Sequence, residues 1–218
     1  MGQKVNPFGF RLGPLYSWKS RWFAGKGNYR HQILEDYALR RFLHQKLLSA
    51  GLTKVEIERS INTIKIILFV SRPGVVIGRG GANLETVKKD IIKLLKINPQ
   101  DTKGRKVEIK VEEVRNPDIQ AQLILDHLKD QLAKRYPHRR AVAQALDKAM
   151  NAGAKGIKIA LAGRIAGAEI GRREKYTAGS IPTQTLRADI DYAESPALTR
   201  SGYVGIKVYV YKGEKATV

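Results

Sequence analysis

The glycine-rich segment Gly78-Arg79-Gly80-Gly81 combines residue types that can hold a phosphate backbone. Glycine lets a second chain approach closely because it carries no Cβ atom. An apolar turn, Val75 to Ile77, precedes the segment, and a helix is predicted to begin at about Ala82. The first N–H groups of a helix favour an anion, and Arg79 adds a positive charge. The spacing Gly-x-x-Gly therefore predicts a loop that binds a sugar–phosphate chain.

Competing chemistries lack the residues that they need. A Walker phosphate loop requires Gly-x-x-x-x-Gly-Lys followed by Ser or Thr, which the sequence does not contain. Asn83 stands where a dinucleotide-binding fingerprint has its third glycine. The sequence has no cysteine, and its four histidines lack the spacing of a metal site. Asp189 and Asp191 alternate on a predicted strand, but no acid–base partner is near, so we expect ion pairs there and no catalytic residue, metal or cofactor.

Two further groups of basic residues surround breaks between predicted elements. The first group lies on both sides of Pro137 and comprises Lys134, Arg135, Arg139 and Arg140. Two helix ends that meet at Pro137 would gather these side chains into one RNA-binding patch, although a solvated helix face is an equally ordinary arrangement. The second group surrounds a glycine-rich hairpin and comprises Arg164, Arg172 and Arg173. We expect this hairpin to contact RNA as well; the alternative is that its glycines only shape the turn.

Residues 1–30 differ in composition from the rest of the chain. They contain six basic residues, no acidic residue and seven of the sixteen aromatic residues. Glycine and proline interrupt any helical or strand periodicity. We expect a mobile arm that becomes ordered on RNA, with Lys4 and Arg11 on phosphates and rings such as Trp22 on bases. The alternative is a tail whose aromatic residues pack on its own domain.

The whole chain of 218 residues is strongly basic. Forty Lys and Arg residues face twenty Asp and Glu residues, which gives a formal net charge of +20. Such a surplus repels itself unless a polyanion is present, and nucleic acid is a more ordinary partner than an acidic membrane surface. Hydrophobic residues make up 43% of the chain, which excludes wholesale disorder. No uncharged apolar run reaches the roughly 18 residues of a membrane span, so we expect a soluble, intracellular protein that binds a polyanion.

The glycine loop lies within an ordered series of predicted elements. They are a helix over 28–48, strands over 54–59 and 63–71, a short apolar turn over 75–77, a helix over 82–96, a loop over 98–106 and a strand over 107–112. Apolar residues recur on one face of the first helix, among them Ile33, Leu34 and Tyr37. The order helix, strand, strand, short helix, Gly-x-x-Gly, helix, strand is that of a type II K-homology (KH) domain, which clamps four nucleotides with this loop.

The second half of the chain predicts a different arrangement. Its expected elements are helices over 117–135 and 139–151, then strands over 156–163, 168–176, 185–192 and 202–211. The sequence therefore predicts the α+β class, with an N-terminal type II KH domain of order α-β-β-α-α-β and a second, two-layer α/β domain. We expect three parts: a basic aromatic arm at 1–29, the KH domain at 30–116 and the C-terminal domain at 117–218.

Five segments together resemble a known family over nearly the whole length. They are MGQKVNP-GFRLG at the start, SRPGVVIGRGG at the glycine loop, GAKGIKI-LAGRIAGAEI, the stretch from Pro182 through LRADIDY, and YVGIKVYVYKGE near the end. The chain resembles the family of the universal protein number three of the small ribosomal subunit, in its bacterial form.

The resemblance implies a non-catalytic constituent of the small ribosomal subunit in the cytoplasm, with no membrane and no small-molecule substrate. It implies binding to 16S-type rRNA in the head, here by the arm and the hairpin, and neighbours among the small-subunit proteins numbered two, five, ten and fourteen. The resemblance also implies a place at the mRNA entry channel. Family members hold incoming mRNA and help to melt its helices with a basic motif in the second domain, which Lys134, Arg135, Arg139 and Arg140 match. Ala143 and Gln144 stand where the family pattern often has another basic pair, so the strength of unwinding stays open.

Other functions remain alternatives. One is a free KH-domain regulator that binds mRNA reversibly. Another is a phosphate-transforming or RNA-cleaving enzyme, which the absence of Walker residues, a metal motif and a nucleophile disfavours. The arm without acidic residues favours permanent burial in RNA over reversible scanning.

Overall fold

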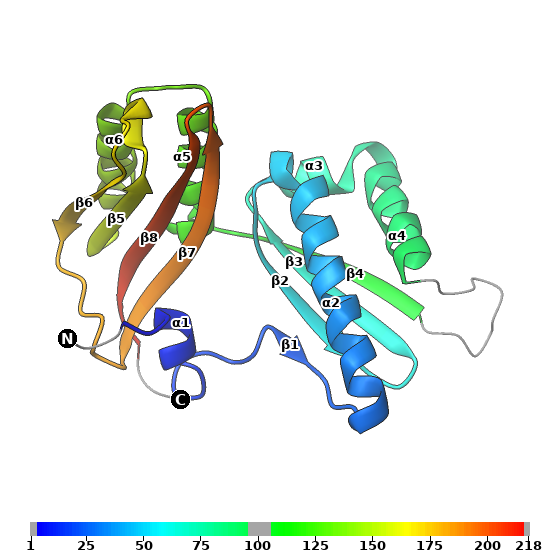
Figure 1. Ribbon diagram of the computed structural model, residues 1–218. Coiled ribbons are helices and arrows are strands. Elements are labelled where there is room, and N and C mark those ends of the chain that lie inside the picture. The colour runs from blue at the N-terminus through cyan, green and yellow to red at the C-terminus, as the bar shows by residue number, and fades with distance from the viewer. Residues whose placement is uncertain (1–3, 96–105, 216–218) are drawn as a thin grey trace. The chain divides into compact units, whose positions relative to one another are not determined.

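The computed structural model describes residues 4–95 and 106–215, and within them the chain forms two compact units (Figure 1). One unit consists of residues 18–115. The other consists of residues 4–17 together with the chain from Asn116 onward. The loop expected at 98–105 and the end of the preceding helix at Lys96 lie outside the described residues.

The first unit is a four-stranded sheet packed against helices. Its elements are β1 (Ser20–Arg21), α2 (Lys26–Lys46), β2 (Leu52–Arg59), β3 (Thr63–Val70), α3 (Pro73–Ile77), α4 (Ala82–Leu94) and β4 (Lys106–Glu113). The sheet order is β1-β2-β3-β4; β2 and β3 are antiparallel, whereas β4 is parallel to β3. Side chains such as Ile57, Ile66 and Leu68 form one core with Leu39, Leu43 and Ile91 from the helices.

The buried face of α2 differs from the face that its sequence suggested. Ile33, Leu34 and Tyr37 are 43%, 54% and 64% exposed, whereas Leu39 and Leu43 are fully buried. Asp36 lies with Leu39 and Leu43 on the side of the helix that packs. Its carboxylate accepts hydrogen bonds from Trp22 Nε1 at 2.8 Å, Ser20 Oγ at 2.9 Å and Arg59 Nε at 2.9 Å. A buried carboxylate is tolerated when it is paired in this way, and hydrophobic periodicity cannot reveal such a position.

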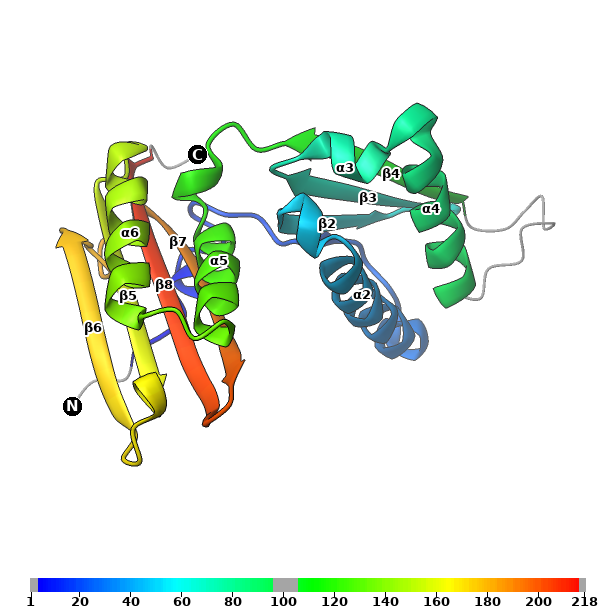
Figure 2. The ribbon, with the colours of Figure 1, turned by 90° about the horizontal axis from the view of Figure 1, so that it is seen from above.

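The second unit is an antiparallel sheet with two helices on one face. Its main elements are α5 (Ala121–Ala133), α6 (His138–Asn151), β5 (Gly156–Gly163), β6 (Arg172–Gly179), β7 (Ala188–Thr199) and β8 (Gly202–Glu214). The strands lie in the order β6-β5-β8-β7, and Figure 2 shows α5 and α6 on the same side of them. Alternate residues of β8, from Val204 to Val210, pack against Leu125, Leu128 and Val142 of the helices. This arrangement is a two-layer α/β domain.

Asp189 and Asp191 lie two residues apart on β7, and each is held by a different lysine. The pairing with β8 shifts by one residue between Asp189–Gly213 and Ile190–Tyr211, because Lys212 is the extra residue of a bulge in β8. Asp191 accepts a hydrogen bond from the Ala121 backbone N–H at 3.1 Å and pairs with Lys212 at 3.1 Å. Asp189 pairs instead with Lys215 at 2.7 Å. Both carboxylates therefore form ion pairs, as expected, each with a different lysine.

The N-terminal segment is not the free arm that its composition suggested. Residues 4–17, which include α1 (Pro7–Phe10), pack on the second unit, with α1 against β7. The Phe8 ring stacks on Tyr16 at 5.1 Å, and Tyr16 donates a hydrogen bond to Asp189 Oδ1 at 2.5 Å. Residues 20–21 pair as β1 with β2 in the first unit. The acidic partners of the segment lie outside it: Asp36 bonds to Ser20 and Trp22, and Asp189 bonds to Tyr16.

Candidate nucleic-acid interface

The glycine loop joins α3 to α4 in a conformation that requires glycine. Gly78, Gly80 and Gly81 have φ angles of 71°, 60° and 83°, which residues with a side chain rarely adopt. A Cβ atom on Gly78 would also lie 2.7 Å from Asn83 Cγ, and the Asn83 amide donates to the Val75 carbonyl at 3.2 Å. By contrast, a Cβ atom on Gly80 or Gly81 would meet nothing within 4 Å. The outer half of the loop is therefore open to an approaching chain.

The electrostatics of the loop favour an anion. Gly81 is the N-cap of α4 and has no side chain to cap the first N–H groups of the helix. Arg79 is exposed, and its side chain has no hydrogen bond or ion pair with any described residue. Val75 and Ile77, just before the loop, are also exposed, so apolar surface lies beside the positive charge. This combination can hold a phosphate and contact a sugar or base next to it.

The basic group around Pro137 forms a tight turn between α5 and α6. Residues 131–136 close α5 with paired hydrogen bonds, from Tyr136 N–H to the Gln131 carbonyl and from Arg135 N–H to the Leu132 carbonyl, both 3.0 Å. This is the Schellman arrangement, whose left-handed position is usually glycine; here Arg135 holds it, with φ 60°. Lys134, Arg135, Arg139 and Arg140 are all exposed. The turn therefore brings the four predicted residues together on the surface.

A hydrogen-bonded network links the start of α6 to β6. His138 Nε2 lies 3.0 Å from Glu174 Oε2, Tyr176 donates to the same oxygen at 2.6 Å, and Arg172 Nε donates to Oε1 at 2.7 Å. The hydrogen bond from Tyr176 is the main reason that the pKa of Glu174 lies below its ordinary value. Arg139 also interacts with the Tyr176 hydroxyl. Glu174 thus organises the basic side chains around it, while the Arg140 side chain has no hydrogen-bond or ion-pair partner among the described residues.

The three hairpin arginines do not form one patch. Arg164 donates from Nε to the Ala168 carbonyl at 2.8 Å and from Nη1 to the Ser201 carbonyl at 3.4 Å. Arg172 and Arg173 are consecutive in β6, so their side chains point to opposite faces of the sheet. Arg172 lies on the helix-covered face with Glu174, whereas Arg173 lies on the other face. The structure instead places Arg164 beside Arg135, in the lining of one cavity.

Two of the predicted arm residues are used inside the protein. The Arg11 side chain is fully buried, and its guanidinium donates to the carbonyls of Pro7 at 3.0 Å, Thr183 at 2.9 Å and Thr185 at 2.9 Å. It therefore cannot reach an RNA phosphate, which corrects the role expected from sequence. Trp22 is half-buried, bonded to Asp36, with its ring 5.5 Å from Tyr29. Lys4 is exposed and stays a candidate for RNA contact.

The open face of the second sheet holds basic and aromatic residues that the sequence interpretation missed. Lys158 of β5 lies 5.4 Å from the Tyr209 ring, and Tyr209 contacts Tyr192 across the strands with 4.8 Å between ring centroids. Burial and then the nearby charges of Lys4 and Lys175 lower the pKa of Lys158. The sequence does contain a signal for this surface. Lys207 and Tyr209 alternate with buried valines, and alternate residues of a strand share a face, so both side chains are expected on the open face.

In the described parts of the chain, no group of three or more His, Asp or Glu side chains is arranged to hold a metal ion. In residues 4–95 and 106–215, no helix combines the length and the apolar character that a membrane crossing needs.

Comparisons with known proteins match both units. A model described as the KH domain matches residues 38–119, and one described as the C-terminal domain of ribosomal protein S3 matches residues 128–210. These matches confirm the predicted α+β class, with a KH domain followed by a distinct second domain.

Full-length relatives are also found. One in Desulforudis audaxviator is 45% identical over 214 residues, covering 98% of this chain and 94% of the relative. One in Thermodesulfovibrio yellowstonii is 45% identical and covers 98% and 95%. One in Desulfatibacillum aliphaticivorans is 46% identical and covers 98% and 94%. Each of the three is named small ribosomal subunit protein uS3.

Proposed function

The chain belongs to the family of the small ribosomal subunit protein uS3, and from that premise we propose that it holds incoming mRNA at the entry channel of the subunit with the turn between α5 and α6. As a member of that family, it is a structural, RNA-binding component of the small subunit in the cytoplasm and not an enzyme. The mRNA contact is assigned to Arg139 and Arg140, supported by Lys134 and Arg135.

One observation carries this proposal: two adjacent exposed arginines stand in the first turn of a helix. Arg139 and Arg140 follow His138, the first residue of α6, and no acidic residue is present in that turn. A cation at this end of a helix opposes the helix dipole, which costs about 0.3–1 kcal/mol for each side chain. Two adjacent cations also repel one another. The arrangement destabilises the free protein slightly, and it becomes favourable when a phosphate lies opposite.

The remaining basic surfaces fit contacts with rRNA. The glycine loop, with Arg79 at its tip, and the exposed Lys4 and Arg173 offer positive charge on other parts of the two units. We propose that these residues bind 16S-type rRNA. We also propose that other surfaces of the chain contact the neighbouring small-subunit proteins two, five, ten and fourteen. The exposed Val75 and Ile77 would also suit a protein contact at the loop.

The mRNA contact is tested by replacing Arg139 and Arg140 together with alanine in reconstituted small subunits. Assembly should be nearly normal, because both side chains are exposed and the α6 core lies on its other face. Translation through a stable mRNA hairpin should slow more than translation through an unstructured message. The affinity for single-stranded RNA should also depend less on salt. Each lost phosphate contact should reduce the slope of log affinity against log salt concentration by roughly 0.7.

A matched control removes the same charge elsewhere in the unit. Lys148 and Lys155 are exposed near the other end of α6, and their double replacement with alanine should affect both messages equally. Normal assembly with equal rates on both messages in the Arg139 and Arg140 variant would exclude the proposal. Failure of assembly would show instead that the two arginines bind rRNA.

A further inference from the structure

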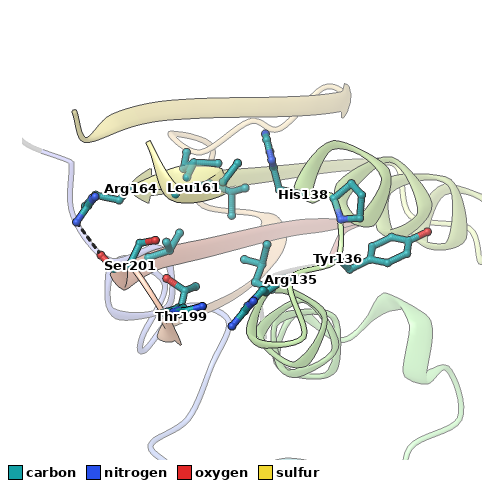
Figure 3. Close-up of a pocket in the computed structure, with 14 residues that line it drawn as sticks. Arg135, Tyr136, His138, Leu161, Arg164, Thr199 and Ser201 are labelled. Atoms are coloured by element: carbon teal, nitrogen blue, oxygen red, sulfur yellow. Dashed lines mark hydrogen bonds between the residues drawn. The ribbon is translucent and has the colours of Figure 1, made fainter. Parts of the chain in front are cut away.

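The second unit contains a cavity of about 320 Å³ beside the turn between α5 and α6. Figure 3 shows Arg135 and Arg164, from separate elements, on either side of it, with Thr199 and Ser201 between them and Tyr136 directed away. Leu132, which is half-buried, and Pro137, which is exposed, form its accessible apolar part. Its volume lies at the lower end of the roughly 300–1,000 Å³ of ligand cavities, so it has room for one small group.

The charge of the cavity is one-sided. Arg135, Arg164 and Arg200 line it, and no acidic residue is among its lining residues. Arg135 and Arg200 have no ion-pair partner within the described chain. Arg164 uses two N–H groups on backbone carbonyls and keeps others uncommitted, since a guanidinium has five. Three guanidinium groups without a carboxylate favour a phosphate, which arginine can bind through two parallel hydrogen bonds.

The backbone around the cavity is strained. Arg135 and Ala166 are the two residues other than glycine with positive φ in the described chain, at 60° and 56°, and both line this cavity. Such conformations are unfavourable for residues with a side chain, and they cluster at binding sites. Arg135 holds the left-handed position after the end of α5, which is usually a glycine. A glycine would adopt this conformation without strain, but it would not supply a positive charge.

We propose that this cavity binds one unstacked nucleotide of single-stranded RNA. The base lies against Leu132 and Pro137, and its phosphate lies on Arg135, Arg164 and Arg200. A short acidic side chain of a protein would meet the charge but would leave the apolar part empty. The inference rests on the proposed function. The bound strand is the same RNA that Arg139 and Arg140 contact, and these two residues follow Arg135 closely in the protein sequence.

Two variants separate the charge of the cavity from its space. Arg135→Gly removes a guanidinium and relieves the strained φ angle, so loss of binding cannot follow from loss of folding. Ser201→Trp keeps all three arginines and fills the space between them. Lys148→Ala is the control, because it removes one charge on an exposed part of the same unit.

The test is a titration of the isotope-labelled full chain, followed through the amide NMR signals of Ala166 and Ser201. Adenosine 5′-monophosphate should shift these signals saturably, and adenosine or ribose 5-phosphate alone should shift them several-fold less. Arg135→Gly should weaken binding by about tenfold, the ratio expected for one charge-assisted hydrogen bond. Ser201→Trp should abolish binding, and Lys148→Ala should leave it unchanged.

A competition identifies RNA as the source of the nucleotide. A single-stranded oligoadenylate about ten nucleotides long, within the usual site size of such surfaces, should displace the mononucleotide, and a duplex of equal length should not. The proposal fails if the oligonucleotide does not displace it, if ribose 5-phosphate acts as strongly, or if no saturable shift occurs. The Arg139 and Arg140 double variant should still bind the mononucleotide, so failure of this cavity and failure of the mRNA contact are separate results.

Discussion

Arg135 occupies a backbone position that glycine would hold at lower free energy. Its φ angle of 60° places it in the left-handed region, which is less favourable for a residue with a Cβ atom by about 1–2 kcal/mol. The residue is exposed, so its side chain contributes no core packing that could compensate. An arginine at this position is therefore explained by what its side chain binds and not by the stability of the helix end.

The first prediction concerns this position. Arg135→Gly should increase the free energy of unfolding of the second unit by about 1 kcal/mol, measured by thermal or urea denaturation. Arg135→Ala keeps the Cβ atom and the strain, so it should show no such gain. Equal stability of the two variants would mean that the backbone at Arg135 is not strained.

At the scale of elements, α2 shows that an apolar helix face is not always the buried one. The second prediction uses two leucines five residues apart. Leu39→Ala should reduce the free energy of unfolding by about 2–5 kcal/mol, because it opens a cavity in the core. Leu34→Ala should change it by less than about 0.5 kcal/mol, because the side chain is exposed. Chemical denaturation measures both, and a large loss with Leu34→Ala would place the buried face where the sequence pattern suggested.

The N-terminal segment is held on the second unit through Asp189. Burial by itself would raise the pKa of this carboxyl. Hydrogen bonds from Lys215 and Tyr16 lower the pKa by more than burial raises it, so the net shift is downward. The unfolded chain therefore binds the proton more tightly than the folded chain does. The resulting stabilisation is fully present above the unfolded pKa of about 3.9 and is lost as the pH falls through the lower folded pKa.

The third prediction follows from that sign. Amide exchange at Leu15 and Tyr16, whose N–H groups bond to the Arg11 carbonyl, should be protected in the free chain near neutral pH and should lose protection below about pH 4. Asp189→Asn should reduce protection at neutral pH by about 1–3 kcal/mol and should remove the acid dependence. The amides of β3 serve as the control and should not respond. Absence of protection in the wild-type chain would restore the expectation of a mobile arm.

At the scale of the whole molecule, the net charge of +20 opposes folding of the chain without RNA. The fourth prediction is that the midpoint of thermal unfolding rises between about 0.1 M and 1 M sodium chloride, because the Debye length falls from about 10 Å to 3 Å. An equimolar neutral solute gives the control for effects of the solute itself. A midpoint that falls with salt would show that local ion pairs, such as those of Asp36 and Glu174, outweigh the general repulsion.

The sequence by itself determined the class of partner and the broad architecture. The charge surplus and the Gly-x-x-Gly spacing indicated RNA, and the order of elements indicated a KH domain. These inferences depend on residue type and on spacing along the chain. The breaks at Pro137 and at Gly78 to Gly81 were readable for the same reason, because proline and glycine act on the backbone locally.

Only the tertiary structure decided where individual charges act. Arg11 is enclosed by carbonyls from residues 183 and 185, and Arg164 lies across a cavity from Arg135; neither relation has a counterpart in local spacing. The bulge in β8 likewise involves Lys212, which pairs with Asp191, whereas Asp189 pairs with Lys215. Hydrogen bonds and ion pairs depend on distance in space, and folding brings together groups that lie more than a hundred residues apart. Composition therefore shows that this chain is basic, whereas the fold decides which of its cations remain on the surface to meet RNA.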